Sequence, residues 1–238
     1  LSDNDTLAAS LRIFIDFDFL DEFKIPVPIF CRWLLSVKKN YRHVTYHNWR
    51  HALNVLQTMF AIFRTGGIEN IFTHLEIFSI LIACISHDLD HRGTNNQYQI
   101  KTMSPLAQLY STSVLEHHHF NQCMLILNSK GSDILSEISK ESRAEVIKII
   151  EYCILATDLS LHFTHLPQFV QLISEKQSNS NIWSDIEAKI LLSKILMTGC
   201  DVSAITKPWS VQKKVAELVA SEFFMQGDIE RKLFNTEP

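Results

Sequence analysis

The run from Ile77 to Ile85 constrains the fold most strongly, because it contains no charged residue. A helix that is apolar on nearly every side is expected at the centre of a protein rather than at its surface. The run is far shorter than the ~20 residues that a membrane-spanning helix needs. Elsewhere the apolar residues recur at helical spacing, and no strand-like alternation extends beyond about three or four residues. The sequence therefore predicts an all-α fold, a compact multi-helix bundle around this central helix.

Further helices are predicted from helical spacing and from start and stop signals. The central helix should begin near Thr73, and stop signals include Pro26, Pro28 and the pair Gly66-Gly67. The other predicted helices span about residues 3–23, 29–41, 46–65, 105–127, 141–162, 185–205 and 210–225, and the most loop-like stretch is 176–184.

Length and composition favour a single domain over residues 1–238. The chain is 46% hydrophobic and 20% charged, with six glycines and six prolines, which leaves little room for disordered linkers. The net charge of −4 argues against a nucleic-acid partner, because such proteins usually carry a basic stripe.

The cysteines and the start of the chain bear on its location. Five cysteines are scattered without a CxxC pair, which is typical of reduced thiols in a cytoplasmic protein. No secretory signal pattern opens the chain, so we expect a soluble protein without a transmembrane segment. Because the first residue is Leu1 rather than Met, we also expect the chain to be part of a longer polypeptide.

The pentad from His87 to His91 directly follows the apolar run. If the helix continues through it, His87 and His91 lie on one face, since four residues make about one turn. Imidazole and carboxylate suit Zn²⁺, Mg²⁺ or Mn²⁺, and Asp88 could bridge two ions. The alternative is a solvated helix end, with Asp90 and Arg92 as ordinary surface charges.

Three other segments carry candidate ligands. His47 and His51 are predicted on one face at the start of a helix, and Glu116 precedes three histidines. These consecutive histidines point in different directions, so most are expected to face solvent or to pack. Asp201 lies in an apolar segment, where an unpaired carboxylate is costly. A metal, a buried arginine or a helix-end hydrogen bond could each compensate for that cost.

Four segments together closely resemble the class I cyclic-nucleotide phosphodiesterase catalytic domain: 46–51, 87–96, 116–120 and 200–209. They occur in the order and spacing of that family, and the resemblance covers essentially the whole chain. Residues 223–228 are similar to the cGMP-hydrolysing branch that carries GAF domains, namely the type five, photoreceptor and type eleven enzymes. The resemblance implies an all-α bundle of the HD/phosphodiesterase type that lacks its last C-terminal helices.

The resemblance also implies a centre of two divalent ions. The protein ligands of the first ion, usually zinc, would be His51, His87, Asp88 and Asp201. Asp88 would also contact a second ion, usually Mg²⁺ and alternatively Mn²⁺. The waters of that second ion would be held by His91, Glu116 and Thr157.

The implied reaction is hydrolysis of a 3′,5′-cyclic nucleotide to a nucleoside 5′-monophosphate. A hydroxide between the two ions would attack the phosphorus, with His91 and Glu116 beside it in the catalytic group. His47 would protonate the O3′ leaving group, with Glu222 supporting its charge. The residues expected to line the nucleotide pocket are Tyr46, Leu159, Ile205, Val219 and Phe223, although such an apolar stripe could also be core.

Substrate choice and activity leave alternatives open. Ala204 stands where cAMP-specific relatives generally have Asn, which favours cGMP or both nucleotides. The glutamine that binds the purine and the phenylalanine that clamps it are expected beyond Pro238. The chain could instead be another HD-type metal-dependent nucleotide phosphohydrolase, or an impaired fragment that acts as a binding module. A homodimer would form through regulatory domains outside this chain.

Overall fold

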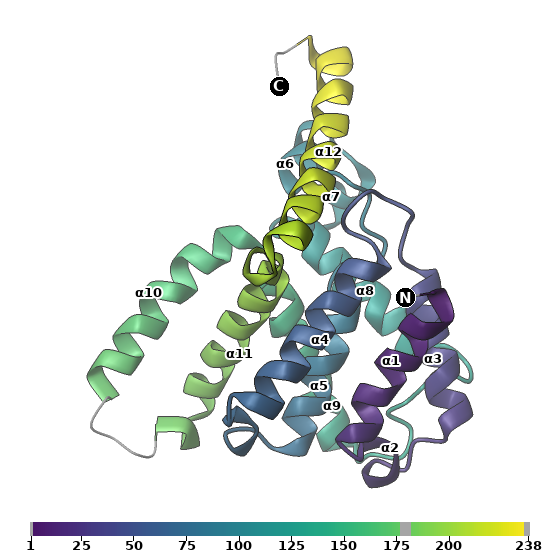
Figure 1. Ribbon diagram of the computed structural model, residues 1–238, viewed down its shortest axis with the longest axis vertical. Coiled ribbons are helices and arrows are strands. Elements are labelled where there is room, and N and C mark those ends of the chain that lie inside the picture. Colours follow the sequence, from purple (N-terminus) through teal and green to yellow (C-terminus); the bar gives the residue numbers. More distant parts are fainter. Residues whose placement is uncertain (1, 177–181, 236–238) are drawn as a thin grey trace.

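The computed structural model describes residues 2–176 and 182–235, and none of these residues forms a strand (Figure 1). The all-α prediction is therefore confirmed for the described part of the chain. The helices, with 3₁₀ turns denoted η, are α1 Asp3–Asp16, α2 Phe19–Glu22, α3 Val27–Lys39, α4 Trp49–Thr65, η1 Ile68–Asn70, α5 His74–Ser86, α6 Asn96–Lys101, α7 Pro105–Leu109, α8 Val114–Leu127, α9 Lys140–Leu155, α10 Leu159–Lys176, η2 Ile182–Ser184, α11 Ile186–Asp201, η3 Ser203–Thr206 and α12 Trp209–Phe234.

Helix α5 forms the centre of the bundle, as the apolar run predicts. Every residue from Ile77 to Ser86 is buried, and the helix packs against α4 and α9. Its first turn is fixed by a capping box, in which the Thr73 hydroxyl accepts from the Glu76 N–H at 3.2 Å. The Glu76 carboxylate accepts from the Thr73 N–H at 2.7 Å. Two of the helix's unsatisfied N–H donors are thus paired reciprocally, which sets its start.

Aromatic side chains pack the first half of α5 against the N-terminal helices. The Phe78 ring of α5 lies 4.8–6.0 Å, centroid to centroid, from the rings of Phe14, Phe19 and Phe23. Phe14 in turn contacts Trp33 of α3 at 6.1 Å. These edge-on and tilted arrangements are the favourable ones for aromatic rings, so α1, α2 and α3 are held as one layer on the bundle.

Three predicted helices are each divided in two. The predicted helix 3–23 breaks between α1 and α2 at Asp18, and 105–127 breaks before α8 at Ser113. Both residues have a left-handed backbone, with φ of +64° and +43° respectively. Neither is glycine or proline, so the usual sequence signals of a break are missing there. The predicted helix 141–162 divides into α9 and α10 at residues 156–158.

Two further predictions of helix ends were wrong. The predicted helix 185–205 ends as α11 at Asp201, and residues after it form the 3₁₀ turn η3. Helix α12 continues through Gly227 to Phe234 instead of ending near residue 225. The Gln226 side chain bonds Asn95 and Glu230 there, and these contacts offset the low helix propensity of glycine, about 1 kcal/mol relative to alanine. Within the predicted loop 176–184, Ile182–Ser184 forms η2, and residues 177–181 lie outside the described residues.

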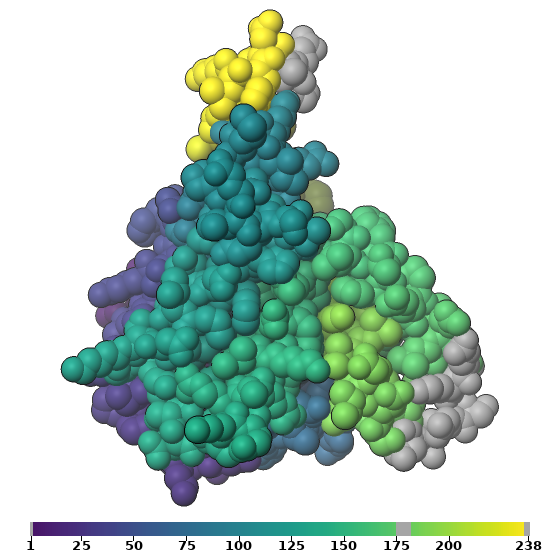
Figure 2. Space-filling model, turned by 180° about the vertical axis from the view of Figure 1, so that it is seen from behind, coloured from purple at the N-terminus to yellow at the C-terminus, as the bar shows by residue number. Residues whose placement is uncertain are grey.

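The upper part of the molecule consists of α12 and the segment containing α6 and α7. Figure 1 shows α12 rising out of the bundle, while α10 and α11 lie side by side at one flank. From behind, the segment around α6 runs up to the end of α12 (Figure 2). The Lys101 Nζ lies 4.3 Å from the centroid of the Phe234 ring at this junction. No helix in the described ranges is both long and apolar enough to cross a lipid bilayer.

Candidate metal centre and active site

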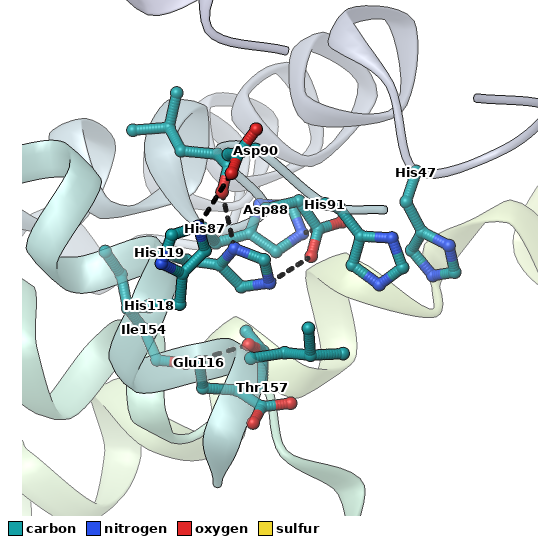
Figure 3. A network of polar contacts seen from close by, with 12 residues as sticks. His47, His87, Asp88, Asp90, His91, Glu116, His118, His119, Ile154 and Thr157 are labelled. Carbon is teal, nitrogen blue, oxygen red and sulfur yellow. Dashed lines mark hydrogen bonds and ion pairs between the residues drawn. The ribbon is translucent and has the colours of Figure 1, made fainter. Parts of the chain in front are cut away.

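The pentad His87–His91 forms a turn after α5 and is not helical. Helix α5 ends at Ser86, and the Leu89 N–H donates to the Ser86 carbonyl at 3.3 Å. Asp90 has a left-handed backbone, with φ of +61°. The prediction that His87 and His91 share a helix face was therefore wrong. The turn nevertheless places both imidazoles close to Asp88: the His87 Nε2 lies 3.3 Å from the Asp88 Oδ2, and His91 lies on the other side of the same carboxylate (Figure 3).

Asp90 fixes this turn against two neighbouring elements. Its carboxylate accepts from the Arg42 Nε at 2.6 Å and lies 2.8 Å from the His118 Nε2 of α8. Its backbone N–H donates to the Asn40 carbonyl at the end of α3, at 2.9 Å. Burial raises the pKa of Asp90, but Arg42 and His118 outweigh that effect and leave the pKa below its usual value. Asp90 is thus an anchored group, and the interpretation of it as an ordinary surface charge was wrong.

Four ligand atoms meet between α4, the pentad and α11. His51 lies in the first turn of α4, and Asp201 is the last residue of α11. The His51 Nε2 is 2.8 Å from the Asp201 Oδ1 and 3.2 Å from the His87 Nε2. The Asp88 Oδ2 lies 3.4 Å from the His51 Nε2 and 3.3 Å from the His87 Nε2. All four residues predicted as ligands of the first ion are therefore brought together.

The chemistry of these atoms fits a divalent cation. The His87 Nδ1 donates to the Cys84 carbonyl at 2.9 Å, so its Nε2 presents a lone pair to the centre. The Asp88 Oδ2 is buried without a hydrogen-bond partner. An ion roughly 2.0–2.2 Å from each atom, with bond angles between about 90° and 109°, would place neighbouring ligand atoms about 2.8–3.6 Å apart. The observed separations of 2.8–3.4 Å agree with that requirement.

A second group of candidate ligands shares Asp88 with the first. The ligand atoms of Asp88, His91 and His119 lie within 4.8 Å of one another. The His119 Nδ1 donates to the Leu89 carbonyl at 2.6 Å, and its Nε2 faces the Asp88 Oδ1 at 3.7 Å. The Gly93 N–H donates to the His91 Nδ1 at 3.0 Å, so the proton of neutral His91 is on Nε2. Burial lowers the pKa of His91 to about 3 and that of His119 to about 4, which keeps both rings neutral.

Glu116 and Thr157 lie on another wall of the same cavity, whose volume is about 600 Å³. Figure 3 shows them below Asp88 and His119. Glu116 comes from the first turn of α8, and Thr157 from the break between α9 and α10. Burial raises the pKa of Glu116 to about 7, although a hydrogen bond from Asn96 opposes this. The carboxylate can therefore exchange a proton near neutral pH.

His47 lies outside α4, so the prediction that it shares a helix face with His51 was wrong. Asn48 caps α4 by accepting from the Arg50 N–H at 2.9 Å, and the helix begins at Trp49. The His47 ring lines the cavity and stacks on the His91 ring, with centroids 4.1 Å apart.

The Glu222 carboxylate of α12 fixes the position of the His47 ring. One oxygen of the Glu222 carboxylate contacts the His47 Nδ1, and the other accepts from the Tyr46 N–H at 2.8 Å. Burial lowers the pKa of His47, but the bond to Glu222 and the charges of Asp88 and Asp201 outweigh it and raise this pKa. Burial raises the pKa of Glu222, and His47 brings it down to about 2. The pair is therefore an imidazolium and a carboxylate.

An apolar groove of about 460 Å³ opens beside His47 and Asp201. Its wall includes all of the predicted pocket residues, Tyr46, Leu159, Ile205, Val219 and Phe223. The side chains of Leu159, Ile205 and Phe223 are more than half exposed, which contradicts the alternative that this stripe is core.

Residues 46–238 match the sequence model of the 3′5′-cyclic nucleotide phosphodiesterase family. The chain belongs to this family. The family resemblance of the four segments is thereby confirmed.

Two insect proteins are similar in sequence to almost the whole of this phosphodiesterase chain. It is 54% identical over 238 residues to the "cGMP-specific 3′,5′-cyclic phosphodiesterase" of Drosophila pseudoobscura pseudoobscura, covering 100% of this chain and 21% of that protein. It is 54% identical over 236 residues to the "Dual 3′,5′-cyclic-AMP and -GMP phosphodiesterase 11" of Drosophila melanogaster, covering 99% of this chain and 16% of that protein. The chain thus spans about a fifth of the length of these relatives, and they match the branch that the sequence resembles.

The fold of the phosphodiesterase chain agrees with a solved structure. The crystal structure of the phosphodiesterase domain of the RhoPDE fusion protein from Salpingoeca rosetta matches it with a TM-score of 0.94. The two sequences are 30% identical, and the match covers 98% of this chain and 73% of the other. The predicted phosphodiesterase-type all-α fold is therefore confirmed.

Two buried histidines of the phosphodiesterase site were missed by sequence reasoning. His118 and His119 are 7% and 1% exposed, and they bond Asp90 and the Leu89 carbonyl. The interpretation that most of the three histidines face solvent or only pack was wrong. A signal was present, because residues 118 and 119 follow Leu115 at helical spacing and precede the apolar Cys123.

Proposed function

We propose that residues 1–238 form the catalytic domain of a 3′,5′-cyclic-nucleotide phosphodiesterase that produces nucleoside 5′-monophosphates. The observation that carries this proposal is the meeting of His51, His87, Asp88 and Asp201 within 2.8–3.4 Å. These residues come from three separate segments, and a bundle without a metal has no physical need to collect them. The names of the insect relatives support cyclic nucleotides as the substrate class.

The residues divide into two ion-binding sets. His51, His87, Asp88 and Asp201 would hold the first ion, for which we propose Zn²⁺ because imidazole and carboxylate suit it. Asp88, with His91, Glu116 and Thr157 around it, would hold a hydrated Mg²⁺ or Mn²⁺. Two bound divalent ions supply Lewis acidity and lower the pKa of water at the reacting phosphate.

His47 is the proposed general acid. Its Nδ1 is engaged by Glu222, so the Nε2 proton is the one available to the cavity. The raised pKa of His47 keeps that proton in place near neutral pH, and transfer to O3′ would complete cleavage of the cyclic ester. The negative charge of the Glu222 carboxylate compensates the positive charge of the His47 imidazolium, and their contact fixes the orientation of the ring.

The apolar groove would take the nucleoside. It opens beside both His47 and Asp201, so a base bound between Phe223 and Leu159 would leave its phosphate near the metal ligands. Ala204 in the groove wall has no side-chain polar group to favour adenine. We therefore propose cGMP, or cGMP and cAMP, as substrates. A cytoplasmic location and a homodimer formed through parts of the protein outside this chain complete the proposal.

The proposal is tested by comparing Asp201→Ala with Asp21→Ala, a control at an exposed site remote from the cavity. Each metal-replete protein is assayed with cGMP, cAMP and linear nucleotides, and its metal content is measured. We expect cyclic-nucleotide hydrolysis only when Asp201 is present, together with loss of the tightly held ion in Asp201→Ala. Normal turnover of Asp201→Ala would refute the site.

Two other outcomes would replace the proposal. Hydrolysis of linear nucleotides alone would favour another HD-type phosphohydrolase. Metal-replete protein that hydrolyses none of these nucleotides would favour an impaired binding module.

A further inference from the structure

Asn96 joins the start of α6 to the start of α8. Its Oδ1 accepts from the Leu115 N–H at 2.9 Å, and its Nδ2 donates to the Glu116 Oε2 at 2.9 Å. A backbone N–H can only donate, so the amide oxygen has to face Leu115. The amide nitrogen must then face Glu116. The orientation of the Asn96 amide is therefore decided by its surroundings, and both of its groups are in use.

The start of α8 explains why this contact matters for Glu116. The cap residue Ser113 does not cap the helix, because its hydroxyl donates to the Asp158 carboxylate at 2.7 Å. Asn96 provides the missing acceptor from another helix. Glu116 is the third residue of α8, where a glutamate commonly folds back onto the helix start. The bond from Asn96 holds this carboxylate in the cavity instead.

The backbone around Asn96 is itself fixed by α12. The Asn95 N–H donates to the Gln226 Oε1 at 2.9 Å, and the Gln226 Nε2 donates to Glu230 at 2.8 Å. Gly93 has a φ of +73°, and a Cβ at that position would lie 3.5 Å from the Glu222 Cγ. The segment therefore passes close against α12 and has little freedom to shift. Because Asn96 belongs to this segment and bonds the Glu116 carboxylate, it holds that carboxylate in a fixed position.

We propose that Asn96 is a positioning residue that holds the Glu116 carboxylate toward the second, hydrated ion beside Asp88. The inference rests on the proposed function, and it adds a specific partner that acts through Glu116. Outer-shell partners of this kind typically change metal affinity or activity by about 10- to 100-fold when removed.

The test compares Asn96→Asp with Asn121→Asp, the same substitution at an exposed site on α8. Aspartate keeps the acceptor for the Leu115 N–H but places an oxygen where the donor to Glu116 stood. Mn²⁺ affinity is measured by calorimetry on metal-depleted protein, and kcat and KM are measured with cGMP. For Asn96→Asp we expect Mn²⁺ binding at the weaker site and kcat each to fall by about 10-fold or more. KM and the tighter site should stay near their wild-type values, and Asn121→Asp should match the wild type throughout.

A double mutant separates positioning from a general structural role. In a Glu116→Gln background, adding Asn96→Asp should lower the weaker Mn²⁺ affinity by less than about 2-fold, because coupled residues are not additive. The inference would be overturned if Asn96→Asp lowered the Mn²⁺ affinity of the Glu116→Gln protein as much as it lowers that of the wild type. It would also be overturned if Asn96→Asp alone kept the wild-type Mn²⁺ affinity. If Asn96→Asp does not fold, Asn96→Ala is used in the same two backgrounds, although it removes the acceptor for the Leu115 N–H as well as the donor to Glu116. A wild-type protein that hydrolyses no cyclic nucleotide would refute the proposed function, while the Mn²⁺ measurements would still decide the role of Asn96.

Discussion

At the scale of single residues, Glu222 determines what His47 can do. The residue is only 4% exposed, and its carboxylate bonds both the His47 ring and the backbone before α4. A buried carboxylate of this kind favours the protonated imidazole, and it also fixes which ring nitrogen faces the cavity. The pair can therefore be tested separately for proton donation and for pH dependence.

Replacing His47 by alanine should lower kcat with cGMP by roughly 10²-fold or more, because the proposed general acid is removed. Both ions should still bind, because His47 is not among the proposed ligands of either one. Metal analysis and kinetics on the same preparation check this. Loss of metal together with activity would instead make His47 a structural support of the centre.

Replacing Glu222 by glutamine should move the alkaline limb of the kcat/KM profile to lower pH. The folded pKa of His47 is raised, so its acid form persists below that pKa and is lost as pH rises through it. Removing the Glu222 charge lowers this pKa, and the loss begins earlier. Glu217→Gln, at an exposed site on α12, is the matched control. Identical profiles for both variants would contradict the role of Glu222.

Asp90 provides a stability prediction, with Asp18 as its control. Both have a left-handed backbone, but the Asp18 side chain makes no capping bond, whereas Asp90 bonds Arg42 and His118. We expect Asp90→Ala to lower the free energy of unfolding by about 2–3 kcal/mol more than Asp18→Ala, as for lost charge-assisted hydrogen bonds. Urea unfolding at pH 7 measures the difference.

The difference between Asp90→Ala and Asp18→Ala should shrink in acid. The folded pKa of Asp90 is lowered, so its stabilising effect is present above the unfolded pKa of about 3.9 and is lost as pH falls through the folded value. A difference that does not change with pH would show that its charge is not involved.

At the scale of helices, the first turn of α5 is the clearest case in which sequence determines a boundary. We expect Thr73→Ala to cost about 1 kcal/mol of the free energy of unfolding, because it removes the capping hydroxyl. Thr73→Ser keeps the hydroxyl and should cost much less. Chemical denaturation of the three proteins measures this, and equal losses in both variants would argue against the capping box.

The helices that were predicted too long show what local patterns leave out. The spacing of apolar residues correctly predicted that α5, α9 and α11 are helices, because each of them buries a regular face. It did not predict where α8 and α10 start, since these starts depend on bonds between elements, such as Ser113 to Asp158 and Asn96 to Leu115. Asn48 was a readable capping signal, and it would have placed His47 outside α4.

At the scale of the whole molecule, a bound ion should act as a cross-link. The proposed ligands of the first ion come from α4, the pentad and α11, so binding would join segments that are separate in the sequence. An ion at 100 times its Kd stabilises a protein by about 2.7 kcal/mol. For a chain of this size that corresponds to a rise in Tm of about 5–10 °C.

Adding Zn²⁺ to metal-depleted protein should therefore raise the Tm by about 5–10 °C, and a chelator should reverse the rise. Asp201→Asn serves as the control, because it keeps the shape of the side chain and removes its charge. Differential scanning calorimetry provides the measurement. The same rise in both proteins would mean that the stabilising ion binds elsewhere.

Sequence patterns identified the candidate residues, but they could not bring the residues together. His51 and Asp201 are 150 positions apart, and His47 and Glu222 are 175 positions apart, so no local period relates them. Only the family resemblance predicted their meeting. Helical spacing could have indicated that His118 and His119 are buried, but the partners of Asn96, His118 and His119 depend on how α8 packs against the turn after α5.

These long separations also give the centre an order of assembly during translation. The histidines emerge from the ribosome early, whereas Asp201 and Glu222 emerge only after most of the bundle has been synthesised. A nascent chain can therefore complete neither the proposed ligand set nor the proposed proton donor until most of its helices have been made. Under the proposed function, hydrolysis would begin only after that point.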